Sequence, residues 1–501
     1  MKTKKRILSV ATISLCLVLL MCSLTGCGKY DKEISAEGVD FNFTIGEFNY
    51  FYYDIWKTYY TTSYEYEQEY GLSYGKIFTG YDFNLSPEKQ ELTEEDFEYF
   101  GITAENLGAE KPTWADYFRY NALLRVVYCK YIEAIAEAEG IAVTKEQKAE
   151  IDKTISSVKA EANIKEMEYD EYAQSKYGEF VTIQVLENSL KLSALADNYY
   201  EMLKVQLKKA ISFDELNEQY KSNTEKYNVV TYRGYYITDK EYAEDFTNKI
   251  KDDNSFVKLV EQHYKDQETY DEHMDYDAYC LIQNNTRTAI AEVDERVEEW
   301  VFDENRKSGD KACIPLDQNN DGTDDTYYIA YMLEPEHQMN LDIADARVIQ
   351  FNIDEDTDKA AALAEAQKVM KLYKENPTEE NFIALAKKYS ENETNSADGG
   401  LYEAVANDEN YAEEFVRWIH DDSRKIGDVE ILQVNDIYGI VYYVGNKGKS
   451  WMTTVKEDIL NLKIAEFENK FIEDYARKFD ITDKVLLEAT EKQCALIETK
   501  I

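Results

Sequence analysis

The chain has 501 residues, with 56 Lys and Arg against 99 Asp and Glu, and a formal net charge of −43. It is 44% hydrophobic and 13% aromatic with five Pro, which excludes an intrinsically disordered chain despite the charge. The charge also excludes a nucleic-acid partner, because phosphate binding needs a basic surface, and the length predicts roughly two to four domains.

The first 27 residues have the pattern of an export signal. Basic residues at positions 2 to 6 precede an apolar run from Ile7, which ends at Leu24-Thr25-Gly26-Cys27. This ending resembles a bacterial lipobox, which implies removal of residues 1–26 and lipid attachment to the Cys27 thiol. The protein would then be anchored on the extracytoplasmic face of a bacterial cell membrane. A plain transmembrane anchor of about 18 residues is the alternative.

The cysteines beyond Cys27 leave two possibilities open. Their spacing contains no Cys-x-x-Cys, which argues against a zinc ribbon or a thioredoxin-like site. They are either paired in disulfides or buried as free thiols, and the second is favoured. The four residues are Cys129, Cys280, Cys313 and Cys494.

Residues 27–225 are predicted to form a helical module. Thr113 and Asp116 have the spacing of a capping box, and Gly140 ends the apolar periodicity that follows. The pattern further predicts one long helix over about residues 169–210.

A dense aromatic segment, residues 49–60, is predicted to be a helix within this module. Such a stripe at helical spacing is more often core than a binding surface. The alternative is a tyrosine-rich surface that holds unfolded peptide through large contact area and adaptable hydrogen bonds.

An internal repeat follows the helical module. Residues 300–310 match residues 418–428 without a gap, sharing Trp, Arg-Lys and Gly-Asp at the same places. The motif Phe-x-x-Leu also occurs at 256–259 and again at 382–385. Two copies of one domain explain this better than chance. We therefore predict domains at 226–338 and 339–447, followed by a C-terminal helix at 448–501.

Residues 345–446 resemble a parvulin-type peptidyl-prolyl isomerase domain. The residues that carry the resemblance are Ala346-Arg347-Val348-Ile349, Asn381-Phe382, Leu385-Ala386, Tyr389-Ser390, Gly399-Gly400-Leu401, Phe415, Gly427-Asp428-Val429 and Tyr438-Gly439-Ile440-Val441. The order of the whole chain is similar to extracytoplasmic foldase lipoproteins of the PrsA and SurA kind. The resemblance implies an α+β fold: a helical chaperone-like module, two parvulin-like domains of which the first is degenerate, and a C-terminal helix that packs back on the helical module.

The resemblance also implies a site. Leu401, Tyr411 and Phe415 fall where the family builds its proline pocket and are the expected substrate-binding residues. The family's two histidine positions are Val348 and Val441 here, and Asn392 stands at its Asp or Cys position as the candidate catalytic residue.

Two functions therefore compete. The first is a membrane-anchored foldase whose isomerase domain assists unfolded or newly secreted polypeptides and requires no cofactor. The second is a client-binding chaperone on the same scaffold with inactive isomerase domains. An unrelated solute-binding lipoprotein would instead have two doubly wound α/β lobes, which the repeat and the helical first part disfavour.

A separate motif resembles a calcium loop. Asp317, Asn319, Asp321 and Asp325 surround a Gly with the alternation that can place several oxygens on a hard cation. Tyr328 stands at the twelfth place, where an EF-hand has Glu. Asn-Asp-Gly is also a good hairpin turn in its own right, so calcium binding and a plain turn both remain open.

Overall fold

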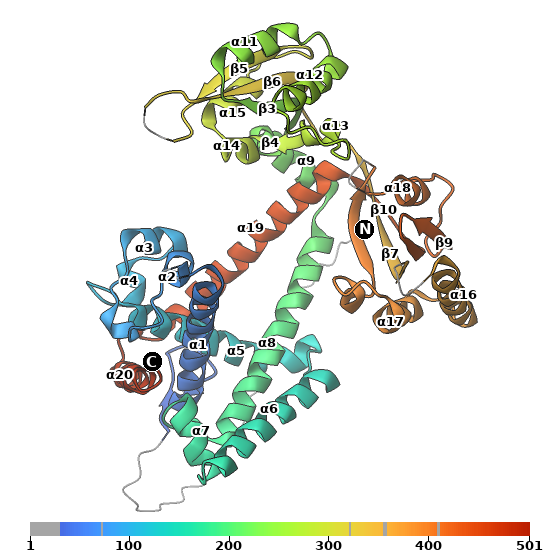
Figure 1. The fold of residues 1–501 in the computed structure, drawn as a ribbon. Helices are drawn as coiled ribbons and strands as arrows, with labels where there is room; N and C mark the ends of the chain where they lie inside the picture. Colours follow the sequence, from blue (N-terminus) through green and yellow to red (C-terminus); the bar gives the residue numbers. More distant parts are fainter. Residues whose placement is uncertain (1–30, 72–73, 320–321, 354–357, 408–410) are drawn as a thin grey trace, which may run out of the picture. The chain divides into compact units, whose positions relative to one another are not determined.

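The structure, a computed structural model, describes residues 31–71, 74–319, 322–353, 358–407 and 411–501. Its contacts divide the chain into two compact units. One contains the described residues up to Met202 together with Glu468–Ile501, and the other is Leu203–Phe467. The fold class is α+β, as the sequence predicts (Figure 1).

The first unit is mainly helical, with a small two-stranded sheet. Its strands are β1 (Glu33–Ile34) and β2 (Phe43–Thr44). Its helical elements are α1 (Ile45–Tyr70), α2 (Tyr74–Thr79), η1 (Pro87–Lys89), α3 (Glu94–Phe100), α4 (Ala104–Leu107), α5 (Trp114–Glu139), α6 (Lys145–Ile164), α7 (Tyr169–Tyr177), α8 (Ile183–Ala210, which continues into the second unit), η3 (Ala476–Lys478) and α20 (Lys484–Glu498).

Side-chain caps fix most of the helix starts that the sequence predicts. Helix α5 begins after Thr113, whose backbone N–H donates to the Asp116 carboxylate at 2.8 Å, and it ends at Gly140 in the left-handed conformation. The single helix predicted over 169–210 is wrong. It is interrupted at Gly178, whose φ of 125° lies where a side chain is strained, and helix α8 begins only at Ile183.

The predicted C-terminal helix is in fact two helices, α19 (Ser450–Asp474) and α20. Helix α20 packs back against α1, as the resemblance implies. Gln493 lies at this contact with 1% of its surface exposed and donates from Nε2 to the carbonyls of Asn49 and Tyr177, both at 3.0 Å. An added Cβ at Gly178 would lie 2.1 Å from that nitrogen, so the contact needs glycine at the break.

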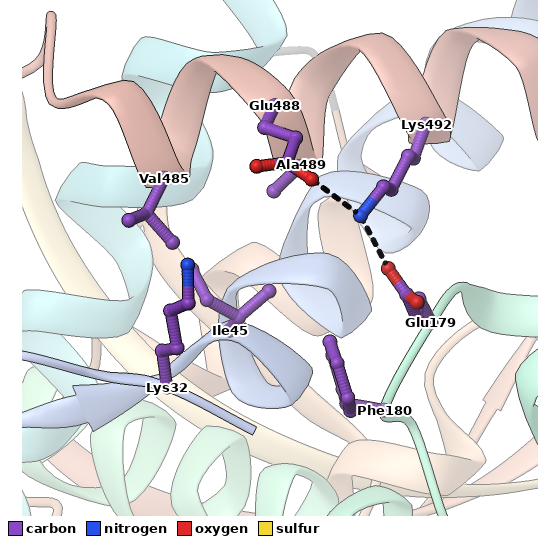
Figure 2. A pocket seen from close by; sticks show the side chains of 8 residues that line it. All are labelled: Lys32, Ile45, Glu179, Phe180, Val485, Glu488, Ala489 and Lys492. Carbon is purple, nitrogen blue, oxygen red and sulfur yellow. Dashed lines mark hydrogen bonds and ion pairs between the residues drawn. The ribbon is translucent and has the colours of Figure 1, made fainter. Parts of the chain in front are cut away.

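A small cavity of about 120 Å³ lies beside this contact (Figure 2). Ile45, Val485 and Ala489 supply its apolar wall. At one side Lys492 forms ion pairs with Glu179 at 2.8 Å and with Glu488 at 3.0 Å. The cavity therefore belongs to the junction that holds α20 in place.

The aromatic segment at 49–60 lies in α1 and divides into two environments. Phe51, Tyr52 and Trp56 are buried, which confirms the core interpretation for this part. The Tyr52 hydroxyl lies 3.5 Å from the Cys494 sulfur of α20, so the aromatic core also contacts the last helix. The later turns of α1 carry exposed tyrosines instead.

The second unit contains two four-stranded antiparallel sheets with the same strand order, β4-β3-β6-β5 and β8-β7-β10-β9. This confirms the repeat, because corresponding strands occupy corresponding places. The strands are β3 (Val229–Ile237), β4 (Leu281–Thr286), β5 (Lys311–Leu316), β6 (Thr326–His337), β7 (Asp342–Asn352), β8 (Leu401–Ala406), β9 (Val429–Val434) and β10 (Ile437–Lys449). The helical elements besides α19 are α9 (Phe213–Ser222), α10 (Thr224–Tyr227), α11 (Lys240–Lys249), α12 (Asp253–Asp266), α13 (Tyr276–Tyr279), α14 (Arg287–Ala291), α15 (Glu295–Val301), α16 (Lys359–Glu375), α17 (Glu379–Tyr389), η2 (Ser396–Asp398) and α18 (Glu413–Ile419).

Each sheet is covered on both faces. In the second sheet, Ile349 and Phe351 of β7 pack with α16 and α17, whereas Ala346 and Val348 pack with α18. In the first sheet, α11 and α12 cover one face and α14 and α15 the other. Alternate residues of a strand therefore reach two separate cores.

The four cysteines that the structure describes are free thiols, as favoured from the sequence. Burial raises the pKa of both Cys129 and Cys494 to about 12, and that of Cys280 to about 11. These thiols are therefore protonated and unreactive near neutral pH.

Replacing Gln493 tests the contact between α20 and α1. We expect Gln493→Ala to lower the free energy of opening of these two helices by about 2 kcal/mol, because buried carbonyl groups lose their donor. Amide hydrogen exchange of α1 and α20 measures this free energy of opening for the first unit alone. Glu491→Ala, on the exposed side of the same helix, is the control. Equal protection in the two variants would contradict the assigned role.

Candidate functional site

The candidate site lies on the α18 face of the second sheet. Val348 of β7 and Val441 of β10 are direct cross-strand partners, so both side chains reach this face. They are 7% and 1% exposed and belong to one apolar cluster with Phe415 and Trp418 of α18. The two positions that resemble the family's histidines are therefore adjacent, and here they form part of a filled core.

Three aromatic rings form the outer edge of this core. The Phe415 ring lies 5.7 Å from that of Tyr402 and 6.2 Å from that of Tyr411, measured between centroids. The rings of Tyr402 and Tyr411 are 6.3 Å apart and nearly perpendicular. Phe415 is 8% exposed and Tyr411 is 37% exposed, so the group passes from core to surface. We call these three residues the aromatic margin.

A neutral amide network borders the aromatic margin. The Asn392 side-chain Nδ2 donates to the Tyr402 hydroxyl and to Gln350 Oε1, both at 3.3 Å. Its Oδ1 accepts from the Thr394 backbone N–H at 3.0 Å, which fixes the orientation of the amide. Asn392 therefore contacts the aromatic margin directly, through Tyr402.

The loop after α17 positions Asn392 through backbone pairing with β7. The Glu391 N–H donates to the Gln350 carbonyl at 2.9 Å, and the Gln350 N–H donates to the Ser390 hydroxyl at 3.1 Å. The loop thus continues the edge of β7 beyond its pairing with β8. This places the loop residue Asn392 next to a strand residue.

Of the three expected pocket residues, the structure brings Tyr411 and Phe415 together but not Leu401. Leu401 pairs with Arg347, and its neighbour Tyr402 pairs with Ala346 of the α18-side core. Arg347 itself points to the other face, where it contacts Glu379 of α17 at 2.9 Å. Tyr402 therefore takes the place that we assigned to Leu401.

Sequence reasoning missed Gln350 and Tyr402. Alternation along β7 from Val348 would have placed Gln350 on the site face. The sequence holds no such signal for Tyr402, because the strand is irregular: its register shifts and Ala404 has a φ of 49°. His420, the histidine nearest the site in sequence, contacts the Val405 carbonyl at 3.1 Å and ends α18.

The side chains of the aromatic margin, with Asn392 and Gln350, can bind a ring and orient an amide. The aromatic margin offers apolar contact area of the kind that holds a proline ring. Asn392 and Gln350 can donate to or accept from a peptide bond without changing charge.

The corresponding place in the first sheet is filled. Gly234 corresponds to Val348, and the Tyr328 side chain occupies the space that a side chain at 234 would need: an added Cβ would lie 1.9 Å from its hydroxyl. Tyr328 is 3% exposed, and its hydroxyl lies 3.3 Å from that of Tyr232. In the second sheet the sizes are reversed, with Val348 beside Gly439.

The predicted calcium loop is the hairpin between β5 and β6. Asp317 accepts from the Gly322 N–H at 2.8 Å, and Asp325 accepts from the Gln318 N–H at 3.2 Å. Both carboxylates thus take part in the turn, and Asp321 lies outside the described residues. No cluster of three or more His, Cys, Asp or Glu side chains suited to a metal ion occurs in the part of the chain that the structure describes. Calcium binding through Asn319 and its neighbours gains no support from this geometry.

The expected lipid anchor at Cys27 and the expected signal at residues 1–26 lie outside the described residues. Among the helices that are described, none combines the length and apolar character of a membrane span.

Comparison with known proteins identifies the domain that holds the site. Residues 348–442 match the family model for the rotamase, PPIC-type PPIASE domain. This range contains α17, α18 and parts of β7 and β10, and it includes the aromatic margin and Asn392. No curated protein sequence matches the chain.

Solved structures of similar proteins include three bacterial examples. The peptidylprolyl isomerase PrsA of Bacillus anthracis is 14% identical over 60% of this chain and 96% of its own, with a TM-score of 0.18. The foldase protein PrsA of Streptococcus pneumoniae is 13% identical over 83% and 93%, with a TM-score of 0.16. The foldase protein PrsA of Lactococcus lactis is 17% identical over 61% and 93%, with a TM-score of 0.19.

Exchanging the side-chain sizes at positions 234 and 328 tests whether Tyr328 fills the site of the first sheet. Gly234→Val should destabilise this sheet because the new side chain meets Tyr328. The double variant Gly234→Val with Tyr328→Gly repeats the arrangement of the second sheet. It should therefore lose less stability than the sum of the single variants, by about 1–3 kcal/mol of coupling. Hydrogen exchange of β3 and β6 measures each loss.

Tyr327→Gly, one residue away and packed in the other core, is the matched control for this cycle. Its effect should add to that of Gly234→Val within about 0.5 kcal/mol. Equal coupling for Tyr327 and Tyr328 would show that the Tyr328 side chain does not fill the site.

Proposed function

We propose that this protein is a membrane-anchored extracytoplasmic foldase that binds unfolded or newly secreted polypeptides. In this proposal the second domain accelerates cis–trans isomerisation of X–Pro bonds. The observation that carries it is the match of residues 348–442 to an isomerase domain family. It is supported by Tyr402, whose ring contacts those of Tyr411 and Phe415 and whose hydroxyl accepts a hydrogen bond from Asn392. The similar solved proteins named above are described as a peptidylprolyl isomerase and as foldases.

The chemistry needs neither a cofactor nor a covalent intermediate. Rotation about the peptide bond is opposed by amide resonance with a barrier of about 18–20 kcal/mol. A pocket lowers this barrier when it binds the twisted amide better than either planar form. The aromatic margin would hold the proline ring and exclude water, while Asn392 and Gln350 would offer hydrogen bonds to the rotating amide.

A second candidate function is a client-binding chaperone with inactive isomerase domains. The observation that favours it is the buried pair Val348 and Val441, which supplies no polar group where the family has two histidines. In the first sheet the Tyr328 side chain fills the corresponding site beside Gly234, which agrees with an inactive isomerase site in that domain. Both candidates require contact with unfolded polypeptide.

The location follows from the sequence signal rather than from the fold. We infer that lipid on Cys27 holds the protein at the outer face of the membrane, as the lipobox-like segment implies. The acidic body, with a net charge of −43, would be repelled by anionic headgroups and by nucleic acid. Basic clients would be attracted.

Isomerisation by the full chain tests the proposal. Exchange between the cis and trans forms of a short X–Pro peptide, followed by NMR magnetisation transfer, should be faster with the protein than in buffer. Tyr411→Ala, which removes a half-exposed ring, and Asn392→Ala should each slow the catalysed exchange by about tenfold, equivalent to about 1.4 kcal/mol. Tyr99→Ala, an equal truncation at a residue that is 83% exposed, is the control.

A catalysed rate equal to that in buffer would leave the client-binding chaperone as the function. Unchanged catalysis in Tyr411→Ala and Asn392→Ala would place the active site elsewhere. Failure of the full chain to suppress aggregation of an unfolded client would contradict both candidates.

A further inference from the structure

A group of stacked aromatic rings lies where helix α1 ends and α2 begins. The Phe78 ring of α2 is 4.7 Å from the ring of Tyr66 and 6.0 Å from those of Tyr70 and Tyr74, between centroids. Tyr66 and Tyr70 are one helical turn apart on α1, and their rings are 6.0 Å apart. We call these four residues the aromatic ladder.

Three of the four residues of the aromatic ladder are exposed, unlike Phe51, Tyr52 and Trp56 earlier in the same helix. Tyr70, Tyr74 and Phe78 are 52%, 43% and 54% exposed, and the neighbouring Ile77 is 68% exposed. Single exposed apolar residues are ordinary, but a contiguous exposed group marks an interaction surface. The core of this unit is already made by residues such as Trp56, so the ladder is not needed for it.

The surroundings of the ladder are acidic. Glu65, Glu67 and Glu69 alternate with the tyrosines of α1, and Lys76 is the single basic residue in the sequence between Tyr60 and Leu85. None of the three glutamates forms an ion pair with a Lys or Arg among the described residues. The Tyr70 hydroxyl donates a hydrogen bond to Glu69, which leaves the negative charge of that carboxylate in place beside the rings.

The negative charge of this surface favours some binding partners over others. A second copy of this chain also carries a net charge of −43 and would be repelled, as would an anionic lipid surface. A segment that combines Lys or Arg with apolar side chains fits both features. Its apolar groups would cover the rings, and its cations would face the ring surfaces and the carboxylates.

We propose that the aromatic ladder binds extended segments of unfolded polypeptide that carry Lys or Arg next to apolar residues. This inference rests on the proposed function and deepens it, because it names the class of client sequence and the surface that holds it. The surface lies in the helical unit and does not involve Tyr411, Phe415 or Asn392. Client capture and isomerisation would thus use different residues.

Binding of two matched peptides to the full chain tests the inference. The probes are short fluorescent peptides of repeating Lys-Leu-Gly and of repeating Glu-Leu-Gly. The Lys peptide should bind at least about tenfold more tightly than the Glu peptide by fluorescence anisotropy. Its affinity should fall when the ionic strength rises from about 0.05 to 0.5 M, because the added salt screens the attraction.

Variants locate the surface. Tyr70→Ala with Phe78→Ala should weaken binding of the Lys peptide by about tenfold. Glu65→Gln with Glu67→Gln and Glu69→Gln should weaken it and reduce its dependence on salt. Tyr99→Ala, also an exposed tyrosine of this unit, should leave the affinity within about twofold. Unchanged circular dichroism and melting temperature would establish that the variants are folded.

Three results would overturn the inference. They are equal binding of the Lys and Glu peptides, unchanged affinity in the folded ladder variants, and concentration-dependent self-association that the ladder variants abolish. The isomerisation assay separates this failure from failure of the proposed function. Tyr70→Ala with Phe78→Ala should leave the rate on a short X–Pro peptide unchanged.

Discussion

The antiparallel pairing of β7 with β10 is the constraint on which the candidate site depends. Because both faces of this strand pair are buried, each residue has a fixed side: Ile349 packs toward α16 and α17, and Val348 packs toward α18. A shift of one residue would exchange the two cores, so the register is strongly specified. The same register sets Val348 opposite Val441 and directs Gln350 toward Asn392. Strand pairing thus positions Val348, Val441 and Gln350, and the loop that carries Asn392 is held against β7 by its own hydrogen bonds.

The two sheets show which parts of the repeated domain are needed for folding. In both, an Arg side chain stacks on a Trp six residues earlier and donates to its carbonyl: Arg306 on Trp300 at 2.9 Å, and Arg424 on Trp418 at 3.0 Å. The glycine three residues after each Arg donates to the neighbouring central strand. The segments 300–310 and 418–428 therefore form the same turn, bonded to the sheet in the same way. This shared structural role explains why they are the clearest repeat in the sequence. The site positions differ, because Gly234 with Tyr328 and Val348 with Gly439 fill one volume in opposite ways.

Features of the fold that depend on neighbouring residues could be predicted from the sequence, whereas features that depend on contacts between distant residues could not. Capping pairs such as Thr113 with Asp116 fixed helix starts because their hydrogen bonds lie within one turn. The break at Gly178 was missed because its reason is distant: the glycine makes room for Gln493, far along the chain. In the site, Phe415 and Tyr411 follow from the motif order. Tyr402 does not, because an irregular strand moves it to the face where Leu401 was expected.

The two proposed surfaces differ in their chemistry. Glu65, Glu67 and Glu69 lie beside the exposed rings of the aromatic ladder, so the attraction of this surface for a basic segment would be electrostatic and would reach about 10 Å at moderate salt. The aromatic margin is bordered by the neutral amides of Asn392 and Gln350 and offers contact without net charge. Such a surface would select a ligand by its shape more than by its charge, which suits a proline ring whatever the charge of its neighbours. In the proposed function, charge-guided binding of a client and contact with its X–Pro bonds would therefore use different residues and respond differently to salt.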